Sequence, residues 1–407
     1  MKINFFNSIR SQGFNNSIIL SVIVLFVCSF FARCITGSRP ILCKYKSEYY
    51  SFFFASSIKN KGLLKQDLQL IANNNFHKLD YDFVIWPIFS NDPYELNLSH
   101  AWTKPFTIIE KDGLKKNLYF GSNDVGRDIF SGCIYGLQNG MILSLFAIFI
   151  SLLFGFIPTV ILSYLHSIDR KYSLISWIFI FLAALVFAYT LAFILEFKTI
   201  STPALIYCVC IILLLNFLAF RYRNKGRNLN FTFDRFILYF LILFQSIPLL
   251  IYFLVLSQII IKPNIIMIGF MIGILYAPII MKYTRYFTWN RSQENFIQSK
   301  IALGFSDSNI LRTCIIPNVL KDLFPILAFG ICNIVLLEAS LRFLGLGMAI
   351  EEISLGAFLH QSRSFPQAWW LIIFPGLCIY FITYTFYRIG EILSQDLNLQ
   401  SMNSIEN

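Results

Sequence analysis

The stretch LFPILAFGICNIVLLEASL, Leu323–Leu341, decides the fold class of this chain. Its only charged side chain is Glu338, near the carboxyl end of the run. A helix that crosses a bilayer needs about 20 mostly apolar residues, because its backbone has to satisfy its own hydrogen bonds in hydrocarbon. The stretch therefore predicts a transmembrane helix.

The composition extends this prediction to the whole chain. Of 407 residues, 57% are hydrophobic and 14% are charged, and the mean hydropathy is +0.64, which soluble domains rarely reach. Eight apolar runs are long enough to be spans: Ser17–Ala32, Leu137–Leu165, Ile175–Leu195, Thr202–Phe220, Phe236–Ile261, Ile265–Met281, Leu323–Leu341 and Trp369–Tyr387. We expect an all-α polytopic membrane protein with about eight transmembrane helices.

Basic residues predict the orientation of these spans. Lys and Arg are concentrated in three connections, Ser167–Tyr172, Arg221–Arg235 and Lys282–Asn318, which would all be cytoplasmic if the N-terminus is inside. We therefore expect both termini in the cytoplasm. The net charge of +11 reflects this bias and is dispersed over loops, so nucleic-acid binding is not expected.

The first run has an alternative interpretation. It is short and follows Lys2 and Arg10, as the apolar core of a secretory signal peptide does. Seven further spans behind it favour a helix that stays in the membrane.

The longest outer segment, residues 33–135, is large enough for a small extracytoplasmic subdomain. Cys34, Cys43 and Cys133 are expected on this side, where a disulfide is possible but no pairing can be deduced. The nine cysteines lack the spacing of a metal site, so no metal is expected.

The spans are almost bare of the ionisable groups that carry protons or sodium in gradient-driven transporters. Glu338 is the exception, and we interpret it as a structural residue near the interface. The four histidines lie in separate loops, which argues against a membrane enzyme. The chain also has no G-x-x-x-x-G-K-[ST] loop for ATP, so energy for uphill transport would enter through another polypeptide docked on the cytoplasmic side.

The docking candidate is the segment FIQSKIALGFSDSNILRTCIIPN, Phe296–Asn318. Its first part spaces Phe296, Ile297 and Ile301 as one helical face, with Gln298, Ser299 and Lys300 facing elsewhere. Gly304 permits a turn. An ordinary amphipathic loop on the membrane surface is the alternative interpretation of this pattern.

A second short helix is expected after the glycine. Ser306 and Asp307 form its N-cap and first turn, and Ile310, Leu311, Cys314 and Ile315 share one face. Pro317 either ends this helix or marks the entry into the next span.

These residues resemble the EAA loop of ABC-importer permeases. The resemblance rests on ALG at Ala302–Gly304, IIPN at Ile315–Asn318, and the separation of Gly304 from Pro317. In that family the loop forms a coupling helix held in a cleft of the ATPase subunit. The triplet that names the loop is replaced here by Gln298, Ser299 and Lys300. The resemblance implies an ATPase-coupling set of Phe296, Gln298, Ser299, Lys300, Ala302, Gly304, Ser306, Asp307 and Pro317.

Further motifs resemble the dipeptide, oligopeptide and nickel permeases within this family. GSNDVGRD at Gly121–Asp128 is similar to their GTDDLGRD, with Ser122, Asn123 and Val125 as departures. NDPYELNL at Asn91–Leu98 precedes it. LEASLRFLGLG, SLGAFL and AWWLIIFPGLCIY resemble their carboxy-terminal half.

GSNDVGRD itself reads as a structural turn outside the membrane. Gly121 and Gly126 would supply backbone freedom, Asp124 and Asp128 would start helices, and Arg127 would pair with the two carboxylates. We expect this outer motif to order the start of the second span.

The resemblance implies a type I ABC-importer permease core of six spans with an inserted helical hairpin. It suggests these divisions: residues 1–32, cytoplasmic tail and first span; 33–135, extracytoplasmic segment; 136–395, permease transmembrane domain, with the hairpin at about 173–222 and the coupling loop at 282–318; 396–407, cytoplasmic tail.

The implied function is one membrane-spanning subunit of an ATP-driven importer in a bacterial inner membrane. Its implied partners are a homologous permease, two ATP-binding subunits that hold ATP and magnesium, an extracytoplasmic solute-binding protein and membrane lipid. The chain itself would need no cofactor and catalyse no reaction. Di- or oligopeptides are the expected solutes; nickel or another small solute, a stand-alone secondary transporter and a membrane-anchored interaction protein are the alternatives. The sequence identifies no residue that binds the solute.

Overall fold

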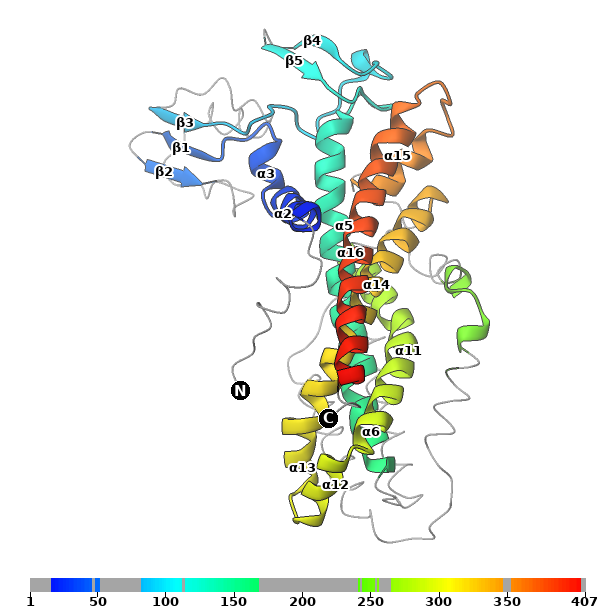
Figure 1. Cartoon of the computed structure of the whole chain (residues 1–407). Helices are drawn as coiled ribbons and strands as arrows, with labels where there is room; N and C mark the ends of the chain where they lie inside the picture. Colours follow the sequence, from blue (N-terminus) through cyan, green and yellow to red (C-terminus); the bar gives the residue numbers. More distant parts are fainter. Residues whose placement is uncertain are drawn as a thin grey trace, which may run out of the picture. The chain divides into compact units, whose positions relative to one another are not determined.

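The structure is a computed structural model, shown in Figure 1. It describes residues 16–45, 48–51, 82–111, 114–167, 241, 244–252, 255, 265–346 and 353–403. Two predicted spans, Ile175–Leu195 and Thr202–Phe220, lie outside the described residues, and so does most of Phe236–Ile261.

Four helical segments in the described residues are long and apolar enough to cross a membrane. These are Ile129–Tyr164, Ile265–Ser292, Asp307–Phe343 and Trp370–Gln395. They correspond to the second, sixth, seventh and eighth predicted spans. The first predicted span is a shorter apolar helix, α2 (Asn16–Phe30). The polytopic helical fold is confirmed in this part of the chain.

The second span begins two turns earlier than its hydropathy predicts. Helix α5 (Ile129–Ser151) continues through the π-helical turn η3 (Leu152–Phe156) into α6 (Ile157–Ser167). Asp128 is its N-cap. The helix begins at Ile129, before the predicted run that starts at Leu137, because Ser131 and the glycines of the first turns lower the hydropathy without interrupting the helix. Cys133 lies inside α5, where it is buried and forms no disulfide with another described cysteine.

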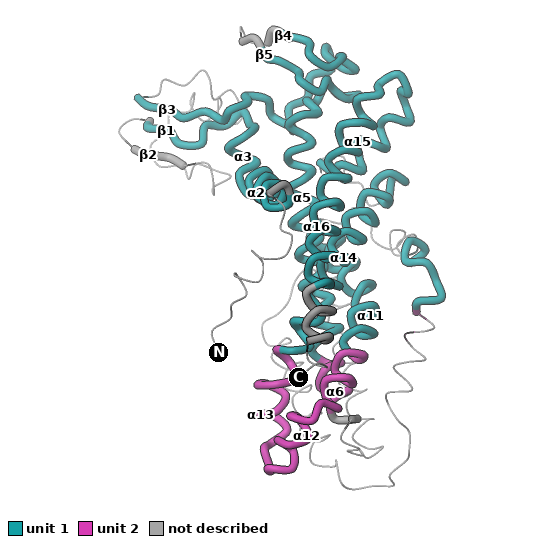
Figure 2. The backbone as a smooth tube through the Cα atoms, in the orientation of Figure 1, with its two compact units in different colours: residues 1–157, 245–284, 318–407 teal, residues 158–244, 285–317 magenta. Residues whose placement is uncertain are grey.

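The chain divides into two compact units, coloured separately in Figure 2. Unit 1 holds residues 1–157, 245–284 and 318–407. Within it, α2, α5 and α16 (Trp370–Asn403) pack against one another. Small residues let the other helices approach closely: a Cβ added at Gly273 of α11 (Ile265–Ser292) would lie 2.7 Å from the Ala147 carbonyl of α5. Such contacts are typical of helices that associate in lipid, where no hydrophobic effect draws them together.

The outer segment adds two small antiparallel sheets to this helical unit. The first has the order β2-β1-β3, from β1 (Leu42–Tyr45), β2 (Glu48–Ser51) and β3 (Phe83–Ile85). The second is a hairpin of β4 (Thr107–Lys111) and β5 (Leu114–Leu118), with Ile109 opposite Lys116. Two short helical turns, α3 (Ala32–Ile35) and η2 (Leu98–His100), also belong to this segment.

Unit 2 holds residues 158–244 and 285–317. Its described part contains α12 (Asn295–Ala302), α13 (Asp307–Ile310) and the π-helical turn η4 (Leu311–Ile315), which leads directly into α14 (Ile316–Phe343). Pro317 therefore does not end the second loop helix; it lies at the entry into the next span, as the alternative interpretation held. Proline cannot donate an amide hydrogen and clashes with the carbonyl four residues before it, and a widened π turn at that point relieves both conflicts.

Candidate functional site

The segment between α11 and α14 forms two helices joined by a defined turn. Its first helix, α12, ends in a Schellman motif at Gly304. The Gly304 amide donates to the Ile301 carbonyl at 3.0 Å, and the Phe305 amide donates to the Lys300 carbonyl at 3.2 Å. Gly304 has φ +80°, a left-handed conformation that an L side chain rarely adopts. The predicted glycine turn is present, with its hydrogen bonds satisfied.

The second helix begins as the sequence indicated. Ser306 is its N-cap and Asp307 its first residue, although the Ser306 side chain makes no capping hydrogen bond. The Ser306 carbonyl accepts hydrogen bonds from the amides of Asn309 and Ile310. Ile310, Cys314 and Ile315 are buried, so the predicted apolar face is the inner one.

Hydrogen bonds from polar side chains hold α12 against the segments before and after it. Lys300 Nζ donates to Cys314 Sγ at 2.9 Å and lies 5.8 Å from the ring centroid of Phe305. Gln298 Nε2 donates to the Ser292 carbonyl at 3.0 Å. Two of the three residues that replace the Glu-Ala-Ala triplet thus hold α12 against its neighbours. The third, Ser299, is exposed and bonds only within α12, to the Asn295 carbonyl at 2.9 Å.

Three large apolar side chains of this loop point to solvent. Phe296 is 43% exposed, Leu303 is 75% exposed and Phe305 is 47% exposed. Leu303 and Phe305 flank Gly304, so the turn presents them together. Sequence periodicity predicted Phe296 on the inner face with Ile297, whereas only Ile297 is buried there. Leu303 and Phe305 were not predicted as site residues, although two large apolar residues beside a turn glycine were a usable signal.

The outer motif Gly121–Asp128 is also a folded turn. Gly121 has φ +80° and Gly126 has φ +72°. A Cβ at Gly126 would lie 1.8 Å from the Asn97 carbonyl oxygen, so only glycine fits there. This close approach joins the motif to the end of NDPYELNL, because the Asn97 amide also donates to the Val125 carbonyl at 3.0 Å.

Asp128 connects this turn to α5. Its Oδ2 accepts from the Ser131 amide at 2.9 Å and lies 2.6 Å from Ser131 Oγ, which is also 3.1 Å from the Asn91 carbonyl. Burial raises the pKa of the Asp128 carboxyl, and the hydrogen bonds to Ser131 oppose that shift. Asp124, by contrast, is exposed. The predicted pairing of Arg127 with both carboxylates stays a prediction.

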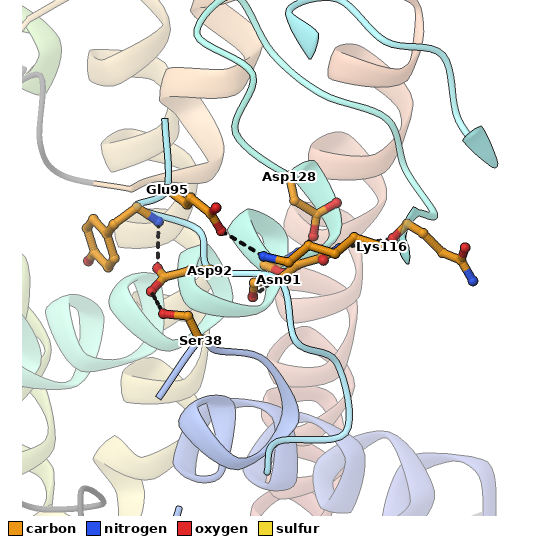
Figure 3. Close-up of polar contacts among 9 residues, drawn as sticks. Ser38, Asn91, Asp92, Glu95, Lys116 and Asp128 are labelled. Atoms are coloured by element: carbon orange, nitrogen blue, oxygen red, sulfur yellow. Dashed lines mark hydrogen bonds and ion pairs between the residues drawn. The ribbon is translucent and has the colours of Figure 1, made fainter. Parts of the chain in front are cut away.

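Figure 3 shows the neighbouring contacts of NDPYELNL. Asp92 accepts from Ser38 Oγ at 2.5 Å and from the Tyr94 amide at 2.9 Å. Glu95 pairs with Lys116 of β5 at 3.0 Å. Within the described residues, no three His, Cys, Asp or Glu side chains are grouped so that they could hold a metal ion.

Two residues that looked like departures from the family motif are its anchors. Ser122 and Asn123 are both completely buried. Ser122 Oγ donates to the His100 carbonyl at 2.5 Å, and Asn123 Oδ1 accepts from the Arg127 amide at 2.7 Å. The Asn123 side chain thus bonds the backbone of the turn itself, and the Ser122 side chain bonds the turn to a carbonyl of a distant segment.

Glu338 is buried and paired. Its Oε1 lies 3.3 Å from Nε of Arg342, one turn later on α14, and only 2% of the Arg342 side chain is exposed. The structural role predicted for Glu338 is consistent with this pair. The pair was not predicted, because the predicted span ended at Leu341, one residue before Arg342. Asp322, at the start of the same predicted span, is buried as well.

Comparisons with known proteins find a family model that matches part of this chain. Residues 217–398 match the profile of the binding-protein-dependent transport system inner membrane components. This region contains both the loop between α11 and α14 and the outer end of α14.

Curated relatives extend the similarity along the chain. The dipeptide transport system permease protein DppC of Alkalihalophilus pseudofirmus is 24% identical over 317 residues, which cover 78% of this chain and 82% of that protein. DppC of Haemophilus influenzae is 29% identical over 34% of this chain and 48% of its own length. The oligopeptide permease OppC of the same organism is 28% identical over 40% of this chain and 53% of its own length. The chain thus spans about half the length of these last two relatives.

A solved structure of the MetNI methionine ABC transporter in an inward-facing conformation matches with a TM-score of 0.39 and 14% identity, over 65% of this chain and 97% of the matched chain. The similarity to known permeases rests on the sequence profile and the curated relatives. Over residues 217–398, the chain is similar to the binding-protein-dependent transport system inner membrane components.

Proposed function

We propose that this chain is the membrane-spanning permease subunit of an ATP-driven importer of di- or oligopeptides, and that its loop between α11 and α14 couples the ATPases to the spans. The observation that supports the proposal is the hydrogen-bonded structure of this loop. Its two helices are joined by a fully hydrogen-bonded glycine turn and fastened by Lys300 and Gln298, so it can transmit a push as one body.

The exposed tip supplies the docking surface of this proposal. Phe296, Leu303 and Phe305 expose apolar surface beside a turn, in a part of the chain expected to be cytoplasmic. Such side chains gain free energy when a partner covers them, at about 25 cal/mol per Å² of buried apolar area. A cleft of an ATP-binding subunit is the proposed partner.

Movement would pass directly into the membrane. Because η4 and α14 continue from α13 without a break, displacement of the tip displaces the inner end of a span. In the proposed cycle, ATP binding closes the two ATPases and the spans reorient around a central path. ATP and magnesium belong to those partners, and a solute-binding protein delivers the solute outside the membrane. The proposal places both termini in the cytoplasm.

Peptides are the proposed solutes because the relatives named above are dipeptide and oligopeptide permeases. The outer segment, with two sheets tied to the start of α5, offers a folded surface for a solute-binding protein. Nickel or another small solute is the second candidate, and a stand-alone secondary transporter is the third.

Uptake by proteoliposomes tests the proposal. The chain, its partner permease, the two ATPases and the solute-binding protein would be reconstituted together, with a radiolabelled dipeptide or nickel as the solute. We expect dipeptide uptake that needs both ATP and the ATPases. Uptake by the lone chain under an ion gradient would contradict the proposal. Uptake of nickel in place of peptide would contradict the proposed solute class and favour nickel.

A further inference from the structure

Three cysteines from distant parts of the chain lie in three helices that pack against one another. Cys28 is in α2, Cys133 is in α5 and Cys378 is in α16. Each of these helices contacts the other two, and they lie side by side in Figure 1. Cys133 is 1% exposed, whereas Cys28 and Cys378 are half-buried. The fold therefore brings together three thiols that are far apart in the sequence.

Aromatic side chains place Cys133 and Cys378 at the same level of the bundle. The ring of Phe120 stacks on that of Phe374 in α16, with 3.8 Å between the centroids, and its centroid lies 5.1 Å from that of Phe130 in α5. Cys133 follows Phe130 by three residues, and Cys378 follows Phe374 by four. Each cysteine is thus about one helical turn beyond a fixed contact between the two helices.

The thiols of Cys133 and Cys378 are hydrogen-bonded to each other. Cys28 also interacts electrostatically with Cys378, so Cys378 is the central member of the group. Cys332, in the neighbouring helix α14, has a different kind of partner, because its thiol donates to the Thr383 carbonyl at 3.2 Å. Direct contact between two thiols therefore singles out Cys133 and Cys378.

The contact between α5 and α16 allows a covalent bond after a small adjustment. Thiols that hydrogen-bond across two packed helices reach the disulfide distance of about 2.05 Å by rotation of their side chains and a small shift of one helix. Pro375 makes such a shift easier in α16, because it cannot donate to the carbonyl four residues before it. The turn that precedes Cys378 therefore has one hydrogen bond fewer than an ordinary helix.

The pair lies near the outer ends of its helices. Cys133 is four residues from the start of α5, and Cys378 is eight residues from the start of α16. At 1.5 Å per residue these positions are about 6 and 12 Å along the two helices, within the outer half of a hydrocarbon core of about 30 Å. In the proposed orientation this half borders the compartment outside the cytoplasm, where disulfides form and persist.

We propose that Cys133 and Cys378 form a disulfide that joins α5 to α16 in the mature protein, and that the structure shows the reduced form of this pair. Cys28 stays a free thiol beside the bond. A metal ion is not the partner of these thiols, because no three His, Cys, Asp or Glu side chains in the described part of the chain could hold one. The inference rests on the proposed orientation, but not on the solute or on the ATPases.

The exposure of the two thiols sets the order of the reaction. Cys378 is the more accessible, so its Sγ attacks a disulfide-bonded oxidant of the outer compartment while α16 packs against α5. A mixed disulfide forms and one thiol of the oxidant is released. Cys133 Sγ then attacks Cys378 Sγ and displaces the second thiol. The two cysteines lose two electrons and two protons, which the disulfide of the oxidant gains as it becomes two thiols.

Mapping of the cysteines by mass spectrometry tests the bond. The full chain would be expressed in a bacterial host whose outer compartment forms disulfides, purified from membranes without reductant, alkylated, and digested with and without reduction. We expect linked peptides that contain Cys133 and Cys378, with less than about a tenth of either cysteine alkylated before reduction. Full alkylation of both cysteines before reduction would overturn the proposal. Linked peptides with Cys28 in place of Cys133 would overturn it as well.

Single serine variants provide matched controls. Cys133→Ser and Cys378→Ser should each abolish the linked peptides and leave the other cysteine of the pair open to alkylation. Cys28→Ser and Cys332→Ser, which change cysteines on neighbouring helices, should keep the linked peptides. Loss of the link in a normally inserted Cys28→Ser chain would contradict the assignment of Cys28 as the free thiol.

The bond should also stabilise the helical unit. It joins positions far apart in the sequence, so it restricts the unfolded chain strongly. We expect reductant to lower the thermal unfolding midpoint of the parent chain by about 5 °C more than that of Cys133→Ser. An equal effect of reductant on both proteins would show that the bond does not stabilise the packing of α5 on α16.

ATP-driven uptake by the parent importer is measured separately. Uptake without the linked peptides would refute the disulfide alone, whereas linked peptides without uptake would refute only the proposed function.

Discussion

Gly126 and Gly304 have similar left-handed backbones but different surroundings. A Cβ at Gly126 would clash with the Asn97 carbonyl, whereas at Gly304 nothing lies within 4 Å of the added atom. Gly304→Ala should therefore cost only the backbone term of about 1–2 kcal/mol. Gly126→Ala should lose the same backbone term and, in addition, the free energy of the clash with the Asn97 carbonyl.

Thermal unfolding of the two purified variants checks this contrast. We expect the midpoint of Gly126→Ala to fall clearly below that of Gly304→Ala, with the parent chain highest. Equal losses in the two variants would mean that the approach of Asn97 to Gly126 contributes nothing to stability.

Asp128 should make stability depend on pH. Because burial raises the pKa of its carboxyl in the folded chain, the folded state binds the proton more tightly than the unfolded state. The contribution of this group is therefore fully present below the ordinary Asp pKa of about 4 and is lost as the pH rises through the raised value.

Asp128→Asn keeps a good N-cap and cannot ionise. The stability of this variant relative to the parent chain should increase as the pH is raised from about 4 to 7. Unfolding midpoints of the two proteins, measured side by side across that range, provide the test. A constant difference between them would show that the carboxyl does not titrate differently on folding.

At the scale of elements, the sequence predicted types better than boundaries. The glycine turn, the Ser306 start and the inner face of Ile310, Cys314 and Ile315 follow from local chemistry. The start of α5 could not be predicted from local chemistry, because polar and glycine residues that pack against other segments lower the hydropathy of its first turns.

The contacts of the short helix α15 (Leu355–Gln361) could not be predicted from the sequence either. The roles of Gly132, Gly136 and Gly356 depend on which helix faces each glycine, and a single sequence does not state the partner. The same reason explains why Ser122 and Asn123 were noted only as departures from a motif. The exposed pair Leu303 and Phe305 is different, since a turn glycine between two large apolar residues is visible in the sequence.

The exposed tip of the loop between α11 and α14 allows a prediction about assembly. A cysteine at Leu303, the most exposed of the three apolar residues there, should crosslink to an engineered cysteine in the cleft of the ATPase. Ser299→Cys, exposed on α12, should also crosslink, in lower yield because its side chain lies farther from the turn. Gel shift after oxidation measures both. Crosslinking of either position to the solute-binding protein would invert the proposed topology.

At the scale of the molecule, α14 has different neighbours at its two ends. The helix continues from the loop between α11 and α14 at one end, and toward the other end it carries the buried ion pair and packs against Gly356. A span of 28 residues is about 42 Å long at 1.5 Å per residue, so it can link events on the two sides of a membrane. The predicted inserted hairpin lies outside the described residues and stays a prediction.

The central claim is that the Gly304 turn makes the loop a rigid coupler, and Gly304→Pro tests it most directly. Proline fixes φ near −65° and removes the amide that donates to Ile301, whereas the native φ is +80°. Asn295→Pro is the matched control, because it puts proline at the first residue of α12, where the amide has no helical partner and the preceding residue is already extended. ATP hydrolysis and dipeptide uptake would be measured together in the reconstituted importer. We expect Gly304→Pro to insert normally and hydrolyse ATP with uptake reduced at least about tenfold, a loss of roughly 1.4 kcal/mol or more in coupling, while Asn295→Pro keeps both activities. Normal uptake by Gly304→Pro would contradict the claim.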